Sequence, residues 1–173
     1  MQRMAVLIYT IIIILALVIQ TTVFAASSVF AVVPDLILVL VVLFSLINGP
    51  GFGAKFGFLA GLGLDLFVGQ MIGLNAVTKM MIGAVVGLMA LRFYKENYVV
   101  PLASVLVATL ADQLLYGLGM AFFGVPVPVR YLLEQVLLPL LLYNGILSLL
   151  LYVRLYYFNK KIFYWDEIFR RSR

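Results

Sequence analysis

The sequence predicts an all-α membrane protein, built as one bundle of six transmembrane helices with both termini in the cytoplasm. Of the 173 residues, 65% are hydrophobic and only 11% are charged, and the mean hydropathy is +1.18. A soluble domain of this size cannot bury so much apolar surface. Six apolar stretches, each close to the ~20 residues that cross a bilayer, fill almost the whole chain. They leave no room for a second domain, so we expect residues 1–173 to form a single unit.

The six expected spans are separated by residues that favour turns, such as Asn48-Gly-Pro-Gly51 and Gly124-Val-Pro-Val-Pro128. The spans cover residues 4–26, 30–47, 53–68, 74–91, 99–123 and 131–157. Residues 158–173 mix aromatic with basic side chains. Aromatic rings suit the headgroup zone and cations suit an anionic inner leaflet, so this tail is expected to lie at the cytoplasmic interface. The alternative is that it binds a cytoplasmic protein.

The orientation follows from the lysines and arginines in the loops, because cytoplasmic loops carry an excess of both. One side of the expected bundle carries only Arg130. The other side carries Arg3, Lys55, Arg92, Lys95, Arg154, Lys160, Lys161, Arg170, Arg171 and Arg173. This distribution places both termini in the cytoplasm. It also explains the net charge of +5 by membrane topology, so we expect no nucleic-acid partner.

The chain contains no cysteine and no histidine. Their absence excludes disulfides, thiolate nucleophiles, Cys/His zinc sites and a Ser-His dyad. The Gly-x-Gly pattern at residues 61–63 lies inside a span, so it is not a nucleotide-binding loop. We therefore expect no catalytic residues, no metal site and no cofactor. An embedded lipid-modifying enzyme would have to rely on the carboxylates of Asp65, Asp112 and Glu134 alone.

Glycines recur at helical spacing in the third and fourth expected spans. Such spacing gives a flat helix face that another backbone can approach closely. The residues concerned are Gly53, Gly57, Gly61, Gly83 and Gly87. Two interpretations stay open for them: tight packing within the six-helix bundle, or a docking face for the helix of a separate protein.

Five ionisable residues fall within the spans, where charges are costly and mark interior sites or partner contacts. They are Asp35, Asp65, Lys79, Asp112 and Glu134, and we group Asn75 and Asn144 with them as an intramembrane polar cluster. Counting along the spans places all five charges in the outer half of the membrane or near its midplane. The cluster either lines an outward-facing polar cavity or forms internal contacts that fix the helix register.

Two expectations concern individual charges in this cluster. Asp65 and Lys79 are expected at the same depth on consecutive antiparallel helices, so we expect them to form an ion pair. Asp112 has no cation nearby in the sequence. We expect it to be protonated, to face water, or to accept a hydrogen bond from Tyr116 or Asn144.

Several short motifs resemble the rod shape-determining protein MreD family. The motifs are Pro34-Asp35-Leu-Ile at the start of the second span, Asp65-Leu66 at the end of the third, Gly69, Gly73-Leu-Asn-Ala76, Asp112 in the fifth, and Pro139 and Asn144 in the sixth. The length, the six spans and the basic tail also match. The specific part of the resemblance lies between Pro34 and Lys79.

The resemblance implies a non-enzymatic inner-membrane protein of the elongation (Rod) complex, which builds the lateral peptidoglycan wall. It implies MreC as the main partner, with MreB, RodA and a class B penicillin-binding transpeptidase in the same complex. It also implies a bundle similar to the substrate-binding S components of energy-coupling-factor vitamin transporters. A transporter S component that binds a small ligand is therefore the alternative function.

Overall fold

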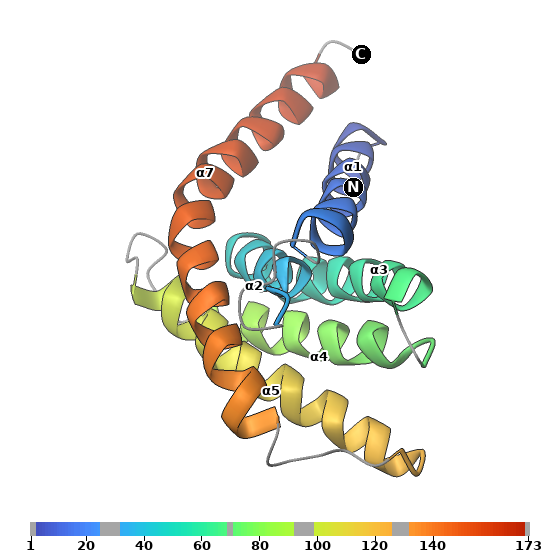
Figure 1. Ribbon diagram of the computed structural model, residues 1–173. Helices are drawn as coiled ribbons and strands as arrows, with labels where there is room; N and C mark the ends of the chain where they lie inside the picture. The colour runs from blue at the N-terminus through green and yellow to red at the C-terminus, as the bar shows by residue number, and fades with distance from the viewer. Residues whose placement is uncertain (1–2, 25–31, 69–70, 92–98, 126–131, 172–173) are drawn as a thin grey trace.

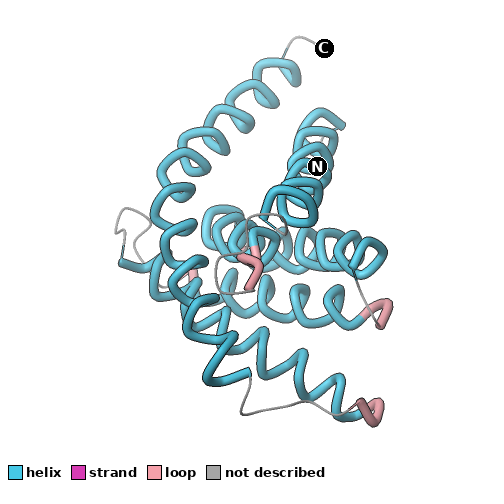
Figure 2. The backbone as a smooth tube through the Cα atoms, viewed as in Figure 1, coloured by secondary structure: helices cyan, strands magenta, loops and turns pink. Residues whose placement is uncertain are grey.

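The computed structural model of the protein describes residues 3–24, 32–68, 71–91, 99–125 and 132–171. Within these ranges the chain is helical and contains no strand (Figures 1 and 2). The elements are α1 (Arg3–Val18), η1 (Ile19–Phe24), α2 (Leu36–Asn48), α3 (Pro50–Val68), α4 (Leu74–Met89), α5 (Val99–Phe122), η2 (Leu132–Leu137) and α7 (Leu138–Arg171). The two η segments are π-helical turns that continue α1 and precede α7.

The helices have the length and composition of membrane-spanning segments. Three described stretches are long and apolar enough to cross a bilayer: Ala5–Val23, Val99–Phe122 and Gln135–Lys161. Two further apolar helices, α2 and α4, are shorter. Many large apolar side chains on the outside of the bundle are exposed, as expected for helices that face lipid. The expectation of an all-α membrane protein is confirmed.

Helix α2 lies at the centre of the bundle and packs against α1, α3, α4, α5 and α7 (Figure 1). Every residue from Leu36 to Leu46 is buried. A helix that is apolar on all sides, as this one is, belongs in a fully enclosed position. Its 13 residues span only about 20 Å, less than the hydrocarbon thickness of about 30 Å. The N-terminus of α2 therefore lies inside the protein, where its free N–H groups need polar partners.

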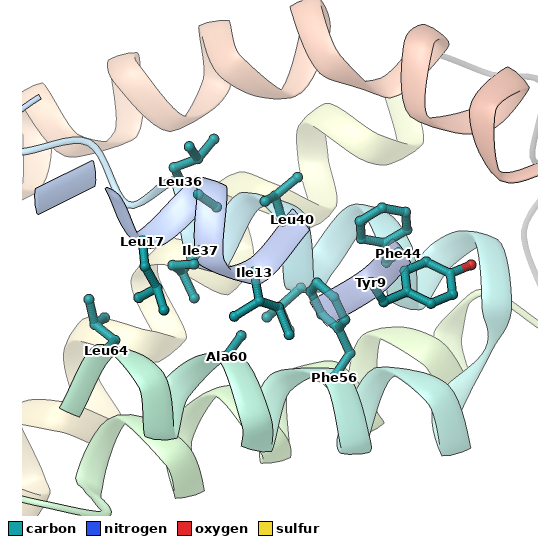
Figure 3. Close-up of a cluster of buried hydrophobic side chains, with 12 residues drawn as sticks. Tyr9, Ile13, Leu17, Leu36, Ile37, Leu40, Phe44, Phe56, Ala60 and Leu64 are labelled. Atoms are coloured by element: carbon teal, nitrogen blue, oxygen red, sulfur yellow. The ribbon is translucent and has the colours of Figure 1, made fainter. Parts of the chain in front are cut away.

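An apolar core fills the space between α1, α2 and α3 (Figure 3). Tyr9, Phe44, Phe52 and Phe56 pack ring against ring, with centroids 4.7–6.3 Å apart. A second cluster joins the opposite side of α2 to α4, α5 and Tyr152 of α7. The two clusters fix α2 from both sides and so hold its N-terminus in place.

Helices α3 and α4 form the closest contact in the described bundle. A Cβ atom on Gly57 would collide with the backbone carbonyl of Lys79, and one on Gly61 would collide with that of Asn75. A Cβ atom on Gly83 would collide with the carbonyl of Gly53. We call this contact the glycine seam; its members are Gly53, Gly57 and Gly61 of α3 and Gly83 and Gly87 of α4.

All five seam glycines are buried within this chain. The expected docking face for a separate helix is therefore wrong for this fold, and packing within the bundle is the correct alternative. The physical reason is that the two glycine faces complement each other, and the short connection between α3 and α4 brings them together first.

Three helix boundaries differ clearly from expectation, and the first is that α2 begins at Leu36 rather than residue 30. Helix α3 begins at Pro50 rather than residue 53, because proline fits the first turn of a helix, where its missing N–H is not needed. Helix α7 continues as one helix to Arg171, so residue 157 is not a helix end. The interfacial location of residues 158–173 stays a prediction, since the side chains beyond Lys161 lie outside those described.

Candidate functional site

The buried N-terminus of α2 is bound by side chains from three elements. Asp35 is its N-cap, and its Oδ1 accepts a hydrogen bond from the Leu38 N–H at 2.8 Å. Gln20 of η1 accepts from the Ile37 N–H at 3.0 Å, and Asn144 of α7 accepts from the Asp35 N–H at 3.0 Å. Asn144 also donates to the hydroxyl of Thr109 on α5 at 3.1 Å. The start of α2 is thus tied to η1, α5 and α7.

The N-terminus of α4 is bound by one carboxylate, that of Asp65 near the end of α3. Its Oδ2 accepts from the backbone N–H groups of Gly73 and Ala76 at 2.9 and 3.0 Å. Its Oδ1 accepts from the backbone and the side-chain amide of Asn75 at 3.1 and 2.8 Å. A helix N-terminus carries a partial positive charge, which stabilises an anion placed there. Asp65 is 2% exposed and is neutralised by this helix end and not by a cation.

Lys79 joins the two capped helices to α5. Its ammonium lies 3.0 Å from Oδ2 of Asp35 and 3.2 Å from Oδ2 of Asp112. It also donates to Oδ1 of Asn75 at 3.3 Å, the residue that contacts Asp65. Lys79 has no exposed surface, and Asp112 is 3% exposed. An ammonium this deep requires such an arrangement, because burying an unpaired charge costs several kcal/mol.

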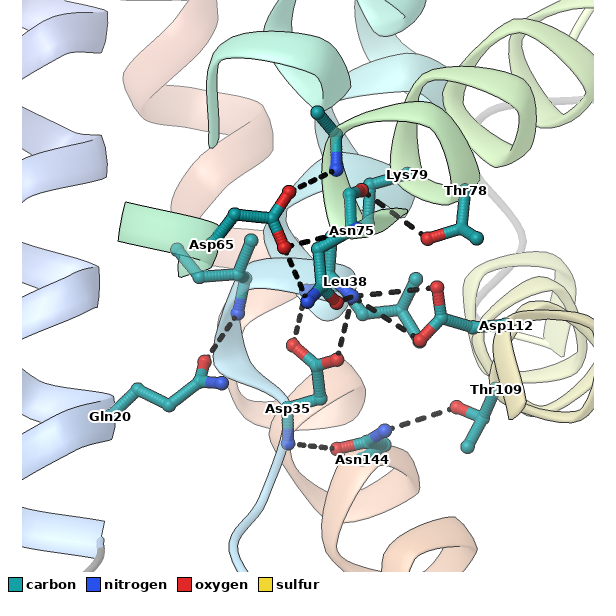
Figure 4. Close-up of polar contacts among 12 residues, drawn as sticks. Gln20, Asp35, Leu38, Asp65, Asn75, Thr78, Lys79, Thr109, Asp112 and Asn144 are labelled. Carbon is teal, nitrogen blue, oxygen red and sulfur yellow. Dashed lines mark hydrogen bonds and ion pairs between the residues drawn. The ribbon is translucent and has the colours of Figure 1, made fainter. Parts of the chain in front are cut away.

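These contacts form one connected network, which we call the polar core (Figure 4). It consists of Gln20, Asp35, Asp65, Asn75, Lys79, Thr109, Asp112 and Asn144. Six of these eight residues belong to the cluster expected from the sequence. Gln20 and Thr109 were missed, although each is a polar residue within an apolar stretch. Glu134 falls in η2, and its side chain lies outside those described.

The expected ion pair between Asp65 and Lys79 is wrong, because the two residues do not share a depth. The glycine seam places Lys79 beside Gly57, two turns along α3 from Asp65. Asp65 instead lies level with the start of α4, where backbone N–H groups take the place of a cation. The expectation failed because helix lengths read from hydropathy leave the register between neighbouring helices open by several residues.

The environments expected for Asp112 did not include a cation, and the structure supplies one from another helix. The Asp112 carboxylate contacts the Lys79 ammonium through both oxygens, at 3.2 and 3.4 Å. The pair is 33 residues apart in the chain. Nothing in the sequence shows that α5 packs beside the Lys79 face of α4.

A second polar contact lies away from the polar core and joins three helices. The hydroxyl of Tyr9 donates to Oδ1 of Asn159 at 2.5 Å. Asn159 and Asn48 also pair through their side-chain amides, at 2.9 and 3.3 Å. This contact ties the first half of α1, the end of α2 and the second half of α7 together. In the sequence, Asn48 was assigned only to a turn, and Tyr9 and Asn159 were not distinguished from their neighbours.

Within the described part of the chain, the side chains of the polar core bind one another and the backbone N–H groups of helix ends. These contacts leave no charged group of the polar core directed at a substrate. Among the described residues, no three aspartate or glutamate side chains lie close enough together to hold a metal ion. Asp65 and Asp112, two of the three carboxylates that an embedded enzyme would require, are bound by different internal donors. The arrangement therefore has the chemistry of a structural joint between helices.

Comparison with known proteins gives one match. No curated protein and no solved structure matches the chain. A model of the family described as rod shape-determining protein MreD matches residues 1–162. Because the match covers nearly the entire chain, including every residue of the polar core and the glycine seam, this protein belongs to the rod shape-determining protein MreD family.

Proposed function

We propose that the chain is a non-enzymatic scaffold of the cell-elongation (Rod) complex and helps to organise lateral peptidoglycan synthesis by binding MreC. The family match supports a role in rod shape determination. The observation that carries the scaffold role is the polar core, whose buried charges all have internal partners. Because the side chains of the polar core bind only groups of the protein's own helices, we infer that the protein acts through its surface.

The MreC contact belongs on the outer apolar surface, since the glycines are used inside the bundle. Large exposed apolar side chains occur on α1, α4, α5 and α7. In membranes, helices associate through close packing of such surfaces with those of a partner. MreB, RodA and a class B transpeptidase then join the same complex through MreC or beside it.

We further propose a multi-pass arrangement in the inner membrane with both termini in the cytoplasm. The contact of Tyr9 with Asn48 and Asn159 supports it, because this contact gathers the first half of α1, the end of α2 and the second half of α7 on one side of the bundle. Exposed Lys55, Lys160 and Lys161 lie close to that end along the chain. An excess of cations marks the cytoplasmic side.

Affinity purification of the tagged chain from native membranes, followed by mass spectrometry, tests the scaffold role. MreC is expected as a stoichiometric partner. Recovery of a transporter coupling protein and its ATPases in place of MreC would overturn the proposal. A separate experiment tests the topology. A reporter that is active only in the cytoplasm is expected to be active when it is fused after Arg173.

A further inference from the structure

We propose that the face of α5 around Gln113 and Gly117 is a contact surface between two copies of this chain. Gln113 follows Asp112 directly, so it lies at the depth of the polar core. Its side chain is partly exposed and forms no hydrogen bond within the described part of the chain. The side-chain amides of Asn75 and Asn144, in contrast, are bonded inside the bundle. The amide of Gln113 is therefore available to a partner outside the chain.

A free amide is costly at this place, because the lipid around α5 offers no hydrogen-bonding groups. Hydroxyl groups avoid this cost by donating to a carbonyl one turn back in their own helix, as Thr10 does to Val6 and Thr109 does to Val105. The amide of Gln113 has an oxygen acceptor as well as two N–H donors. The oxygen needs a donor from elsewhere, because the backbone N–H groups in the middle of a helix are already bonded. A second helix has to supply that donor.

The surface beside Gln113 allows the backbone of another helix to come close. Gly117 lies one turn farther along the same face, and a Cβ atom there would meet nothing within 4 Å. Leu110, one turn in the other direction, is 39% exposed. The second half of α5 lies at the edge of the bundle (Figure 1). Close approach at a small residue and hydrogen bonds from an amide are two means by which membrane helices associate.

A second copy of the chain fits this face better than an unrelated helix. Two copies in one membrane share an orientation, so the axis of a two-fold dimer stands along the membrane normal. Gln113 of one copy then meets Gln113 of the second copy at the same depth. Because an amide is both a donor and an acceptor, each of the two side chains donates to the other. An unrelated partner would need a polar residue of its own at the matching depth.

Disulfide crosslinking tests where the two copies meet. The chain contains no cysteine, so a single introduced cysteine reports a contact between copies without background. Leu110 lies on the proposed face, about two helical turns before Gly117. Leu118 is 67% exposed but lies about 100° around α5 from Gly117, so it is the matched control on the same helix. On oxidation in native membranes, Leu110→Cys is expected to form a linked dimer and Leu118→Cys to remain monomeric.

The variant Gln113→Leu tests the hydrogen bond between the copies. The dimer is measured in lipid vesicles by energy transfer between two fluorophores on differently labelled chains, as the chain is diluted with lipid. Dimerisation of Gln113→Leu is expected to be about tenfold weaker. Thr10→Val is the control, because the hydroxyl of Thr10 is already bonded to the carbonyl of Val6. It is expected to dimerise like the unchanged chain.

Three results would each overturn the proposal: a monomer at every dilution, equal crosslinking at Leu110 and Leu118, or unchanged dimerisation of Gln113→Leu. So would the loss of MreC from the purified complex of Gln113→Leu without any crosslink between copies, since the amide would then bind a different helix. The crosslinking comparison leaves Gln113 in place. It therefore decides the matter alone if Gln113→Leu does not fold.

Discussion

The two faces of α4 are held by opposite kinds of chemistry. Toward α3, the glycine seam brings backbone against backbone, and the only polar side chain of α3 that the described contacts include is Asp65, at the start of α4. Toward α2 and α5, the polar core uses the longest side chain of α4, that of Lys79, to reach two carboxylates. The seam depends on the absence of atoms and the core depends on the presence of charges. The first is therefore broken by adding a methyl group, and the second by removing a partner.

The largest effect is expected from adding a single carbon to the seam. In Gly57→Ala, the new Cβ meets the backbone of Lys79, which cannot move without displacing its ammonium from Asp35 and Asp112. We expect a loss of more than about 5 kcal/mol in the free energy of unfolding, because the cost of overpacking adds to the cost of breaking the buried ion pairs. Gly117→Ala is the matched control, because a Cβ there meets nothing within 4 Å. It is expected to gain about 0.5–1 kcal/mol. Thermal unfolding in detergent measures both, and equal stability of the two variants would contradict the seam.

Removing the central cation comes next. Lys79→Met leaves Asp35 and Asp112 buried without their partner, which is expected to cost about 3–5 kcal/mol. Lys55→Met, at an exposed position of α3, is expected to change little. The double variant Lys79→Met/Asp112→Leu is expected to regain part of the loss, since it removes one of the unpaired carboxylates. Additive losses in a double-mutant cycle would show that Lys79 and Asp112 are not coupled.

A smaller effect is expected where a helix end replaces a cation. Asp65→Asn keeps the shape of the side chain but removes the charge and one acceptor for the N–H groups of Gly73 and Ala76. We expect a loss of about 2–3 kcal/mol, the range for hydrogen bonds to charged groups. Hydrogen exchange should accelerate at the amides of Asn75 and Ala76. Unchanged protection at both amides would mean that Asp65 does not hold the start of α4.

The smallest effect is expected at the contact of Tyr9 with Asn159, which is neutral. Tyr9→Phe removes one hydrogen bond and should cost about 1 kcal/mol. Asn159→Ala should cost slightly more, because it also leaves Asn48 without its partner. A double-mutant cycle is expected to show coupling between the two positions. Strict additivity of the two losses would place them in separate environments.

The sequence predicted the membrane class and most members of the polar core for a simple reason. Polar residues within apolar helices must find partners inside the protein, in other polar side chains or at helix ends, so Asp35, Lys79 and Asp112 were expected inside the bundle. The same rule applies to Gln20 and Thr109, so both could have been predicted as members of the polar core. The contact of Tyr9 with Asn48 and Asn159 was not predicted, because Asn48 was assigned to a turn and Asn159 to the tail beyond the last expected span.

The sequence alone identifies the groups that must avoid the lipid: the charges, the glycine faces and the apolar residues of α2. Their chemistry fixes this outcome whatever the helix order. The pairing within that set follows only from the packing of the helices. In the folded bundle, Lys79 pairs with Asp112 and Asp35, and Asp65 binds the start of α4. The glycines of α3 pack against those of α4. Position along a helix can be counted from the sequence. The rotation of each helix and its register against its neighbours are settled only when all the faces pack at once.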